Sequence, residues 1–174
     1  MLWTQFLRDE IESSYSTTEK LLDKIDPHSL DWKPASGCNW MTVAQLMKHL
    51  SDGCGAAFRA FVTGDWGLPE GFKIEDLKPE EMLPPAEKLP RLDDVATAKE
   101  LLAKDKALAL EILSGLDENE LENRKLAAPW APAIELPLGR HLYQMVQHLE
   151  RHKGQLFYYL KLQGKPVNTA DLWG

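Results

Sequence analysis

The sequence predicts an all-α protein, a four-helix bundle in a single domain. Four long segments carry apolar residues at intervals of three and four, the spacing that places side chains on one face of a helix. No segment shows the alternating, β-branched pattern expected of a strand. The chain has 174 residues, of which 44% are hydrophobic. This length and composition suit one compact domain over residues 1–174.

The first predicted helix spans residues 3–25 and ends before Asp26 and Pro27, because proline restricts the conformation of the residue ahead of it. Its apolar and small residues form a single stripe. These residues are Leu7, Ile11, Tyr15, Thr18, Leu22 and Ile25.

The second predicted helix begins near Thr42 and runs to about Val62, before Gly64. The Thr42 hydroxyl is placed to cap its first turn, while Gln45, three residues on, reaches back to the cap. The third starts after Asp94 and ends at the Ser114–Gly115 pair, with glycine as the stop signal. Its expected inward residues are Ala98, Leu101, Leu108 and Ile112.

The fourth predicted helix covers residues 138–163 and ends at Gly164. A second proline-stiffened loop, residues 126–139, leads into it. About thirty residues with five prolines separate the second and third helices, far more than the roughly 2–8 that join adjacent antiparallel helices. This length predicts a crossover that spans the bundle between helices two and three. The prolines of the crossover are Pro69, Pro79, Pro84, Pro85 and Pro90.

Composition excludes several classes of partner. The net charge of −7 and the absence of a basic stripe argue against nucleic acid. No apolar run reaches the ~18 residues of a membrane span. The N-terminal segment carries Arg8, Asp9 and Glu10 where a secretion signal would be apolar. We therefore expect a cytoplasmic protein that does not bind membranes.

Three histidines are the candidate site. His148 and His152 are four residues apart on the fourth helix, so both imidazoles lie on one face. His152 also falls where the apolar stripe calls for an apolar residue. His49 on the second helix is the best-placed third ligand. Imidazoles turned into a bundle need partners for their ring nitrogens, either a divalent metal or a buried carboxylate.

Four further residues are candidates for the surroundings of this site. Asp105 lies in the apolar stripe of the third helix, where it either orients a ligand imidazole or faces solvent at the edge of the stripe. Gln155 is a possible pocket residue, and Trp130, in the loop before the fourth helix, is expected near a pocket mouth. His141 lies seven residues before His148, ~10 Å along the helix, and is expected at a pocket rim or at the surface.

The residues around the histidines resemble the DinB/YfiT family. The resemblance rests on Trp40, residues 42–46 and His49 on the second helix, and on the run from His148 to Gly164. It covers nearly the whole chain in order and spacing. Lys153 departs from it, since arginine is usual there.

The resemblance implies a bundle of up-down-down-up connection, often a homodimer, that binds nickel, zinc or iron through His49, His148 and His152. Similar proteins include low-molecular-weight thiol S-transferases, a thiol-dependent isomerase and possible hydrolases. The expected function is metal-dependent activation of a low-molecular-weight thiol or of water against a small-molecule substrate. The alternative is a non-catalytic stress-response protein that binds metal or a ligand on the same bundle.

Overall fold

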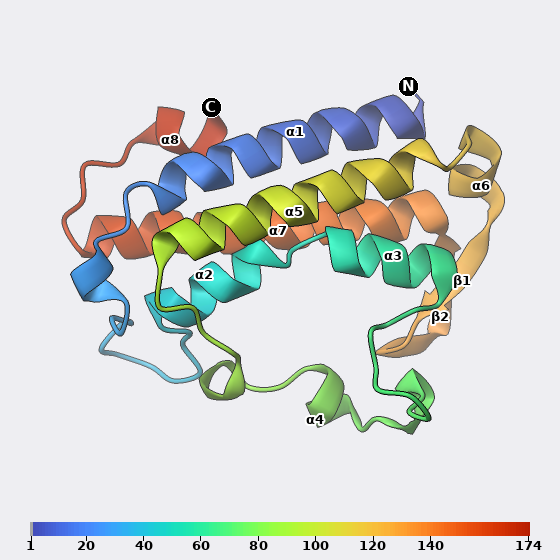
Figure 1. The fold of residues 1–174 in the computed structure, drawn as a ribbon, viewed down its shortest axis with the longest axis horizontal. Coiled ribbons are helices and arrows are strands. Elements are labelled where there is room, and N and C mark those ends of the chain that lie inside the picture. The colour runs from blue at the N-terminus through green and yellow to red at the C-terminus, as the bar shows by residue number, and fades with distance from the viewer. Residues whose placement is uncertain (1) are drawn as a thin grey trace.

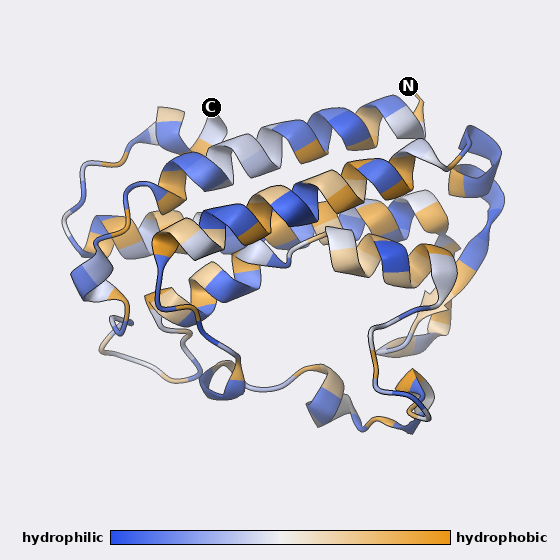
Figure 2. Cartoon of the chain, viewed as in Figure 1, coloured by the Kyte–Doolittle hydropathy of each residue, from blue (hydrophilic) through white to orange (hydrophobic). Residues whose placement is uncertain are grey.

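The computed structural model describes residues 2–174, except for the side chains of Glu75, Pro79 and Glu80. Helices make up most of this part of the chain (Figure 1), as the sequence predicts. Hydrophilic and hydrophobic residues alternate along each long helix (Figure 2), as expected when one face packs on its neighbours and the other meets solvent. No described helix is both long enough and apolar enough to cross a membrane.

Four rods of helix lie side by side. They are α1 (Trp3–Leu22), α5 (Val95–Ser114), α7 (Leu138–Leu162), and a rod made of α2 (Val43–Ser51) and α3 (Gly55–Thr63) placed end to end. α5 packs on α1, α2 and α3, while α7 packs on α1, α2 and α3 from the other side. Buried core side chains come from all four rods; they include Leu7, Ile11, Tyr15, Leu46, Met47, Phe58, Phe61, Leu113, Leu149 and Leu156.

Shorter elements join and flank these rods. They are η1 (Pro27–Ser29), η2 (Ile74–Asp76), α4 (Pro79–Met82), η3 (Ala86–Lys88), α6 (Glu118–Asn123) and α8 (Thr169–Trp173). Three of them interrupt the long segment between α3 and α5, which passes below the α2–α3 rod in Figure 1.

Most predicted helix ends are confirmed. Thr42 and Gln45 form the expected capping box at the start of α2, and the Asp94 side chain caps α5 by accepting from the Thr97 amide. α3 ends at Gly64, whose positive φ of 80° favours glycine. α1 is shorter than predicted, because it ends at Leu22 and continues to Ile25 only as turns.

The predicted second helix is in fact two helices, which is a correction to the sequence analysis. The chain breaks at residues 52–54, and the new helix begins without a side-chain cap from Cys54 itself. The carboxyl group of Asp105 on α5 supplies the cap, since it accepts hydrogen bonds from the amides of Cys54 (2.9 Å) and Ala56 (3.3 Å). A cap from a distant helix leaves no local signal in the sequence.

The inward face of α5 is rotated by one residue from the prediction. Three of the four residues expected to face inward, Leu101, Leu108 and Ile112, are only half-buried. Each has an apolar neighbour on its C-terminal side, so spacing alone fits two registers. The residues that are buried are Ala98, Leu102, Asp105, Ala109 and Leu113.

The predicted loop before the fourth helix contains a hairpin, and the expectation of a protein without strands is wrong at this point. β1 (Lys125–Ala128) pairs antiparallel with β2 (Ala131–Pro137), with Leu126 opposite Leu136 and an irregularity after Ala127. Most residues of β2 are half-buried or exposed on both faces. The strand therefore lacks the alternating pattern that identifies strands with one buried face.

We predict that Asp105→Ala lowers the free energy of unfolding by about 3 kcal/mol. The change leaves the Cys54 amide and the Tyr15 hydroxyl, which donates to Asp105 at 2.5 Å, buried without their acceptor. Urea unfolding followed by circular dichroism measures the difference. Glu100→Ala, at an exposed position of the same helix, is the control, and an equal effect of the two variants would contradict the assigned role.

Candidate metal centre

His49, His148 and His152 converge in the space between α2 and α7. Nε2 of His49 lies 3.1 Å from Nε2 of His148. The three rings meet edge to face, with centroids 4.4–4.8 Å apart, and one nitrogen from each ring lies within 4.8 Å of the others. The predicted trio is therefore brought together as a group that could hold a metal ion.

The environment favours neutral imidazoles. Burial and, to a lesser extent, the neighbouring His152 lower the pKa of His49 and of His148 from 6.5 to about 4. Burial also lowers the pKa of His152, although the hydrogen bond from its Nδ1 to Gln155 acts in the opposite direction. Neutral imidazole is the form that offers a nitrogen lone pair to a metal.

Gln155 orients His152. Its Oε1 lies 3.0 Å from Nδ1 of His152, so the tautomer with hydrogen on Nδ1 donates to it and leaves Nε2 free. The Gln155 amide nitrogen donates to the Tyr159 hydroxyl, which donates to the carbonyl of Met41. Metal-bound histidines are commonly held by such a hydrogen bond on the second ring nitrogen. The predicted role of Gln155 beside the site has a structural basis in this chain of contacts.

The donor set fits a divalent ion. Nitrogens bound to one ion at about 2.1 Å are roughly 3.0–3.4 Å apart, close to the separation of the His49 and His148 nitrogens. Three neutral nitrogen donors with further positions left for solvent or substrate are typical of catalytic rather than structural sites. No carboxyl group lies in this group among the described residues, so the alternative of imidazoles paired with a buried carboxylate is not what the structure shows.

The histidines form one wall of a cavity of about 460 Å³, here called the histidine pocket. The segment before α2 and the crossover between α3 and α5 supply the remaining walls. The described residues that line it include no charged side chain: they are Asn39, Trp40, Met41, His49, Met82, Leu83, Pro84, Ala86, Leu89, His148, His152 and Gln155.

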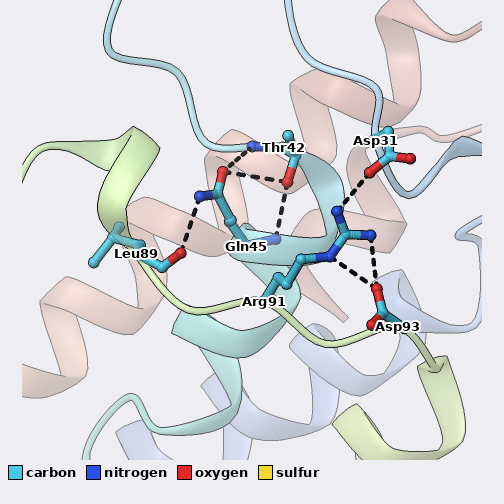
Figure 3. Close-up of polar contacts among 6 residues, drawn as sticks. All are labelled: Asp31, Thr42, Gln45, Leu89, Arg91 and Asp93. Atoms are coloured by element: carbon cyan, nitrogen blue, oxygen red, sulfur yellow. Dashed lines mark hydrogen bonds and ion pairs between the residues drawn. The ribbon is translucent and has the colours of Figure 1, made fainter.

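Gln45 fixes the crossover against α2 (Figure 3). Its Oε1 accepts from the Thr42 amide in the capping box, and its Nε2 donates to the carbonyls of Leu89 and Ala86, each at 3.0 Å. The same residue thus starts the helix that carries His49 and holds the pocket wall opposite the histidines. The sequence indicates the cap, but the crossover contact joins residues more than forty positions apart.

Arg91 makes a second set of contacts that hold the end of the crossover (Figure 3). Its guanidinium pairs with Asp31 at 2.7 Å and with Asp93 at 2.6 Å. Both pairs are largely exposed, so each contributes little to stability. Their effect is positional, because they fix where the crossover enters α5.

Two candidate residues lie elsewhere. Asp105 is buried, so the solvent-facing alternative is wrong, and its hydrogen-bond partners are Tyr15 and the amides of Cys54 and Ala56 rather than an imidazole. His141 is 2% exposed, which contradicts a surface position. Its Nε2 donates to the Leu126 carbonyl and its ring stacks on Phe61.

Trp130 lies at a pocket, but at a different one. It lines a cavity of about 700 Å³ between the end of α3, the crossover and the hairpin, here called the tryptophan pocket. Met82 and Leu83 of the crossover line both this cavity and the histidine pocket. Their part in either pocket had no signal in the sequence analysis.

The contacts of Lys153 show how the chain accommodates a lysine where the family resemblance leads us to expect an arginine. The side chain is 3% exposed, and its ammonium group donates to the Thr17 hydroxyl of α1 at 3.0 Å and to Glu150 at 2.8 Å. It therefore points away from the histidines and joins α7 to α1.

Comparison with known families agrees with this geometry. Residues 10–156, most of the chain, match the DinB superfamily, whose members bind metals. The chain belongs to the DinB superfamily. The match includes all three histidines of the site. No curated protein matches the sequence.

We predict that the metal-free protein loses stability as the pH falls from about 6.5 to about 4, because unfolded histidines take up protons that folded His49 and His148 do not. The unfolded state binds more protons in this window, so lower pH favours unfolding. After allowance for partial solvent exposure, the loss should exceed that of a His49→Gln/His148→Gln double variant by about 2 kcal/mol. Urea unfolding at pH 7.5 and pH 4.5 with a chelator tests this, and parallel losses in the two proteins would count against it.

Gln155→Ala should weaken metal binding by roughly tenfold or more, because His152 loses the acceptor that fixes its ring. Competition titration with a chromophoric chelator measures the affinity. Gln163→Ala, at the C-terminal end of the same helix, is the matched control. An unchanged affinity in Gln155→Ala would show that the ring needs no such support.

Proposed function

We propose that the protein is a metal-dependent enzyme that activates a low-molecular-weight thiol or water at the three-histidine site, in a transferase or hydrolase reaction on a small electrophile. The observation that carries the proposal is the convergence of three depressed-pKa imidazoles in a cavity whose described lining holds no charged side chain. Such a site lacks a carboxylate to act as general base. Activation of the nucleophile would then come from a metal ion bound by the three imidazoles.

A bound divalent ion supplies that chemistry, because it lowers the pKa of a bound thiol or water toward neutrality. His49, His148 and His152 are the residues that would hold it. Nickel, zinc and iron are the candidates that imidazole ligands suit.

The residues of this chain prepare the site in three ways. The hydrogen bond between His152 and Gln155 selects one tautomer and one ring orientation. Burial keeps the imidazoles unprotonated at neutral pH, so no proton has to leave before they bind. Apolar residues of the crossover, Leu83 and Leu89 among them, border the cavity and reduce the access of bulk water to the reacting group.

We also infer that the rods follow the up-down-down-up order of the family. The crossover leaves the end of α3 and is hydrogen-bonded near the start of α2 before it enters α5. α5 therefore starts at the end of the bundle where α2 starts, which supports a parallel course for the two (Figure 1).

His49→Ala, His148→Ala and His152→Ala should each abolish stoichiometric metal binding and reduce turnover to the background rate. Elemental analysis of purified protein, followed by assays of the reloaded protein with physiological thiols and a panel of alkyl, epoxide and ester electrophiles, provides the test. His28→Ala, at an exposed position of η1, is the matched control.

The outcomes separate the two candidate functions. Metal-dependent turnover that is lost in the histidine variants supports the enzyme. Stoichiometric metal without turnover on any thiol or water reaction would instead favour the non-catalytic binding protein. A preparation that holds no metal and cannot be reloaded would overturn both.

A further inference from the structure

The tryptophan pocket has the size and lining of a small-molecule site. Its volume of about 700 Å³ lies within the roughly 300–1,000 Å³ of typical ligand pockets. Three aromatic rings meet edge to face in its lining: Phe61 to Trp66 at 5.2 Å, Phe61 to Trp130 at 6.0 Å, and Trp66 to Trp130 at 5.8 Å. Such a cluster favours a flat aromatic or apolar guest, which can meet ring edges and faces in turn.

Arg124 supplies the polar contact in this apolar lining. It is the charged residue among the described residues that border the cavity. Its Nη2 donates to the Val62 carbonyl at 2.8 Å, which fixes the guanidinium at the end of α3. Among the side chains that the structure describes, no carboxylate pairs with it. A guanidinium so held, with donors to spare, matches a ligand carboxylate in two parallel hydrogen bonds.

The two pockets adjoin along the bundle. Phe61 stacks on His141 at 4.6 Å, and His141 precedes His148 by seven residues of α7, about 10 Å of helix. Met82 and Leu83 border both cavities. Arg124 lies beside the end of α3, the part of the α2–α3 rod farthest from His49. Arg124, the apolar tryptophan pocket and the three imidazoles therefore follow one another in this order along the bundle.

We propose that the tryptophan pocket binds the apolar body of the substrate, an aromatic carboxylate whose carboxyl group meets Arg124 and whose other end reaches the histidine pocket. This inference rests on the proposed function for the reacting end, but binding in the tryptophan pocket itself does not require a metal.

The binding test uses metal-free protein, with 2-naphthoate as the probe and 2-naphthalenemethanol as its uncharged counterpart. Titration calorimetry should show naphthoate bound about fivefold more tightly than the alcohol. Arg124→Gln should remove this preference and leave binding of the alcohol unchanged. Arg8→Gln, at an exposed position of α1, is the control for loss of a positive charge.

Two further variants test the cavity. Trp130→Ala should weaken both probes roughly tenfold, and Trp130 is 41% exposed, so the fold should tolerate the change. Ala127→Phe, which fills the cavity from β1, should weaken them likewise. Trp173→Ala, at an exposed site on α8, is the control for loss of an indole. Equal binding in wild-type and cavity variants, or no binding of either probe, overturns the proposal.

A cobalt(II)-loaded sample tests the link to the histidines. Proton resonances of bound naphthoate should broaden strongly in the cobalt protein, but not in the zinc-loaded protein or in His148→Ala. Binding that depends on Arg124 and Trp130 without broadening overturns the substrate role, because the ligand then lies far from the ion. If the wild-type protein takes up neither cobalt nor nickel, zinc or iron, the proposed function fails and the substrate role with it. The metal-free titration still decides, separately, whether the pocket binds carboxylates.

Discussion

The carboxyl group of Asp105 is the contact on which the arrangement of helices depends. It accepts from the Tyr15 hydroxyl of α1 and from two amides at the start of α3, so α1 and the α2–α3 rod meet at a single buried side chain of α5. Gly55 makes the approach possible, because a Cβ there would lie 2.4 Å from the Asp105 carbonyl oxygen. The break that this contact stabilises divides the α2–α3 rod into a part that carries His49 and a part that borders the tryptophan pocket.

Burial of the three imidazoles costs free energy that packing alone does not explain. Polar rings held half-buried and unprotonated give up hydration without gaining a carboxylate partner. Two of their nitrogens instead approach each other to 3.1 Å, a separation that suits two ligands of one ion. Membership of a superfamily of metal-binding proteins gives this geometry a chemical reason. The same burial that destabilises the protonated rings keeps them ready to bind.

Features set by local sequence could be predicted, and those set by distant contacts could not. The stripe of α1, the capping box at Thr42, the start of α5 after Asp94 and the course of α7 all follow from spacing and end signals. The three histidines of the candidate site followed from the spacing of His148 and His152 and from the position of His49.

The break before α3 was missed because its cap comes from α5, fifty residues away. The hairpin was missed because neither strand has one buried face and one solvent face, the condition that produces alternation. The sequence analysis correctly placed Trp130 at a pocket. A sequence does not, however, indicate which of several cavities a loop residue borders.

Gln45 joins two events that are usually separate. Its carboxamide closes the first turn of α2 through the oxygen and secures the crossover through the nitrogen. Fraying of that turn therefore releases the crossover segment that forms a wall of the histidine pocket. Movement of this segment away from α2 in turn removes support from the first turn of the helix. The entrance of the histidine pocket and the first turn of α2 should open as one cooperative unit. Access to the imidazoles is then governed by the local unfolding free energy of that single helical turn.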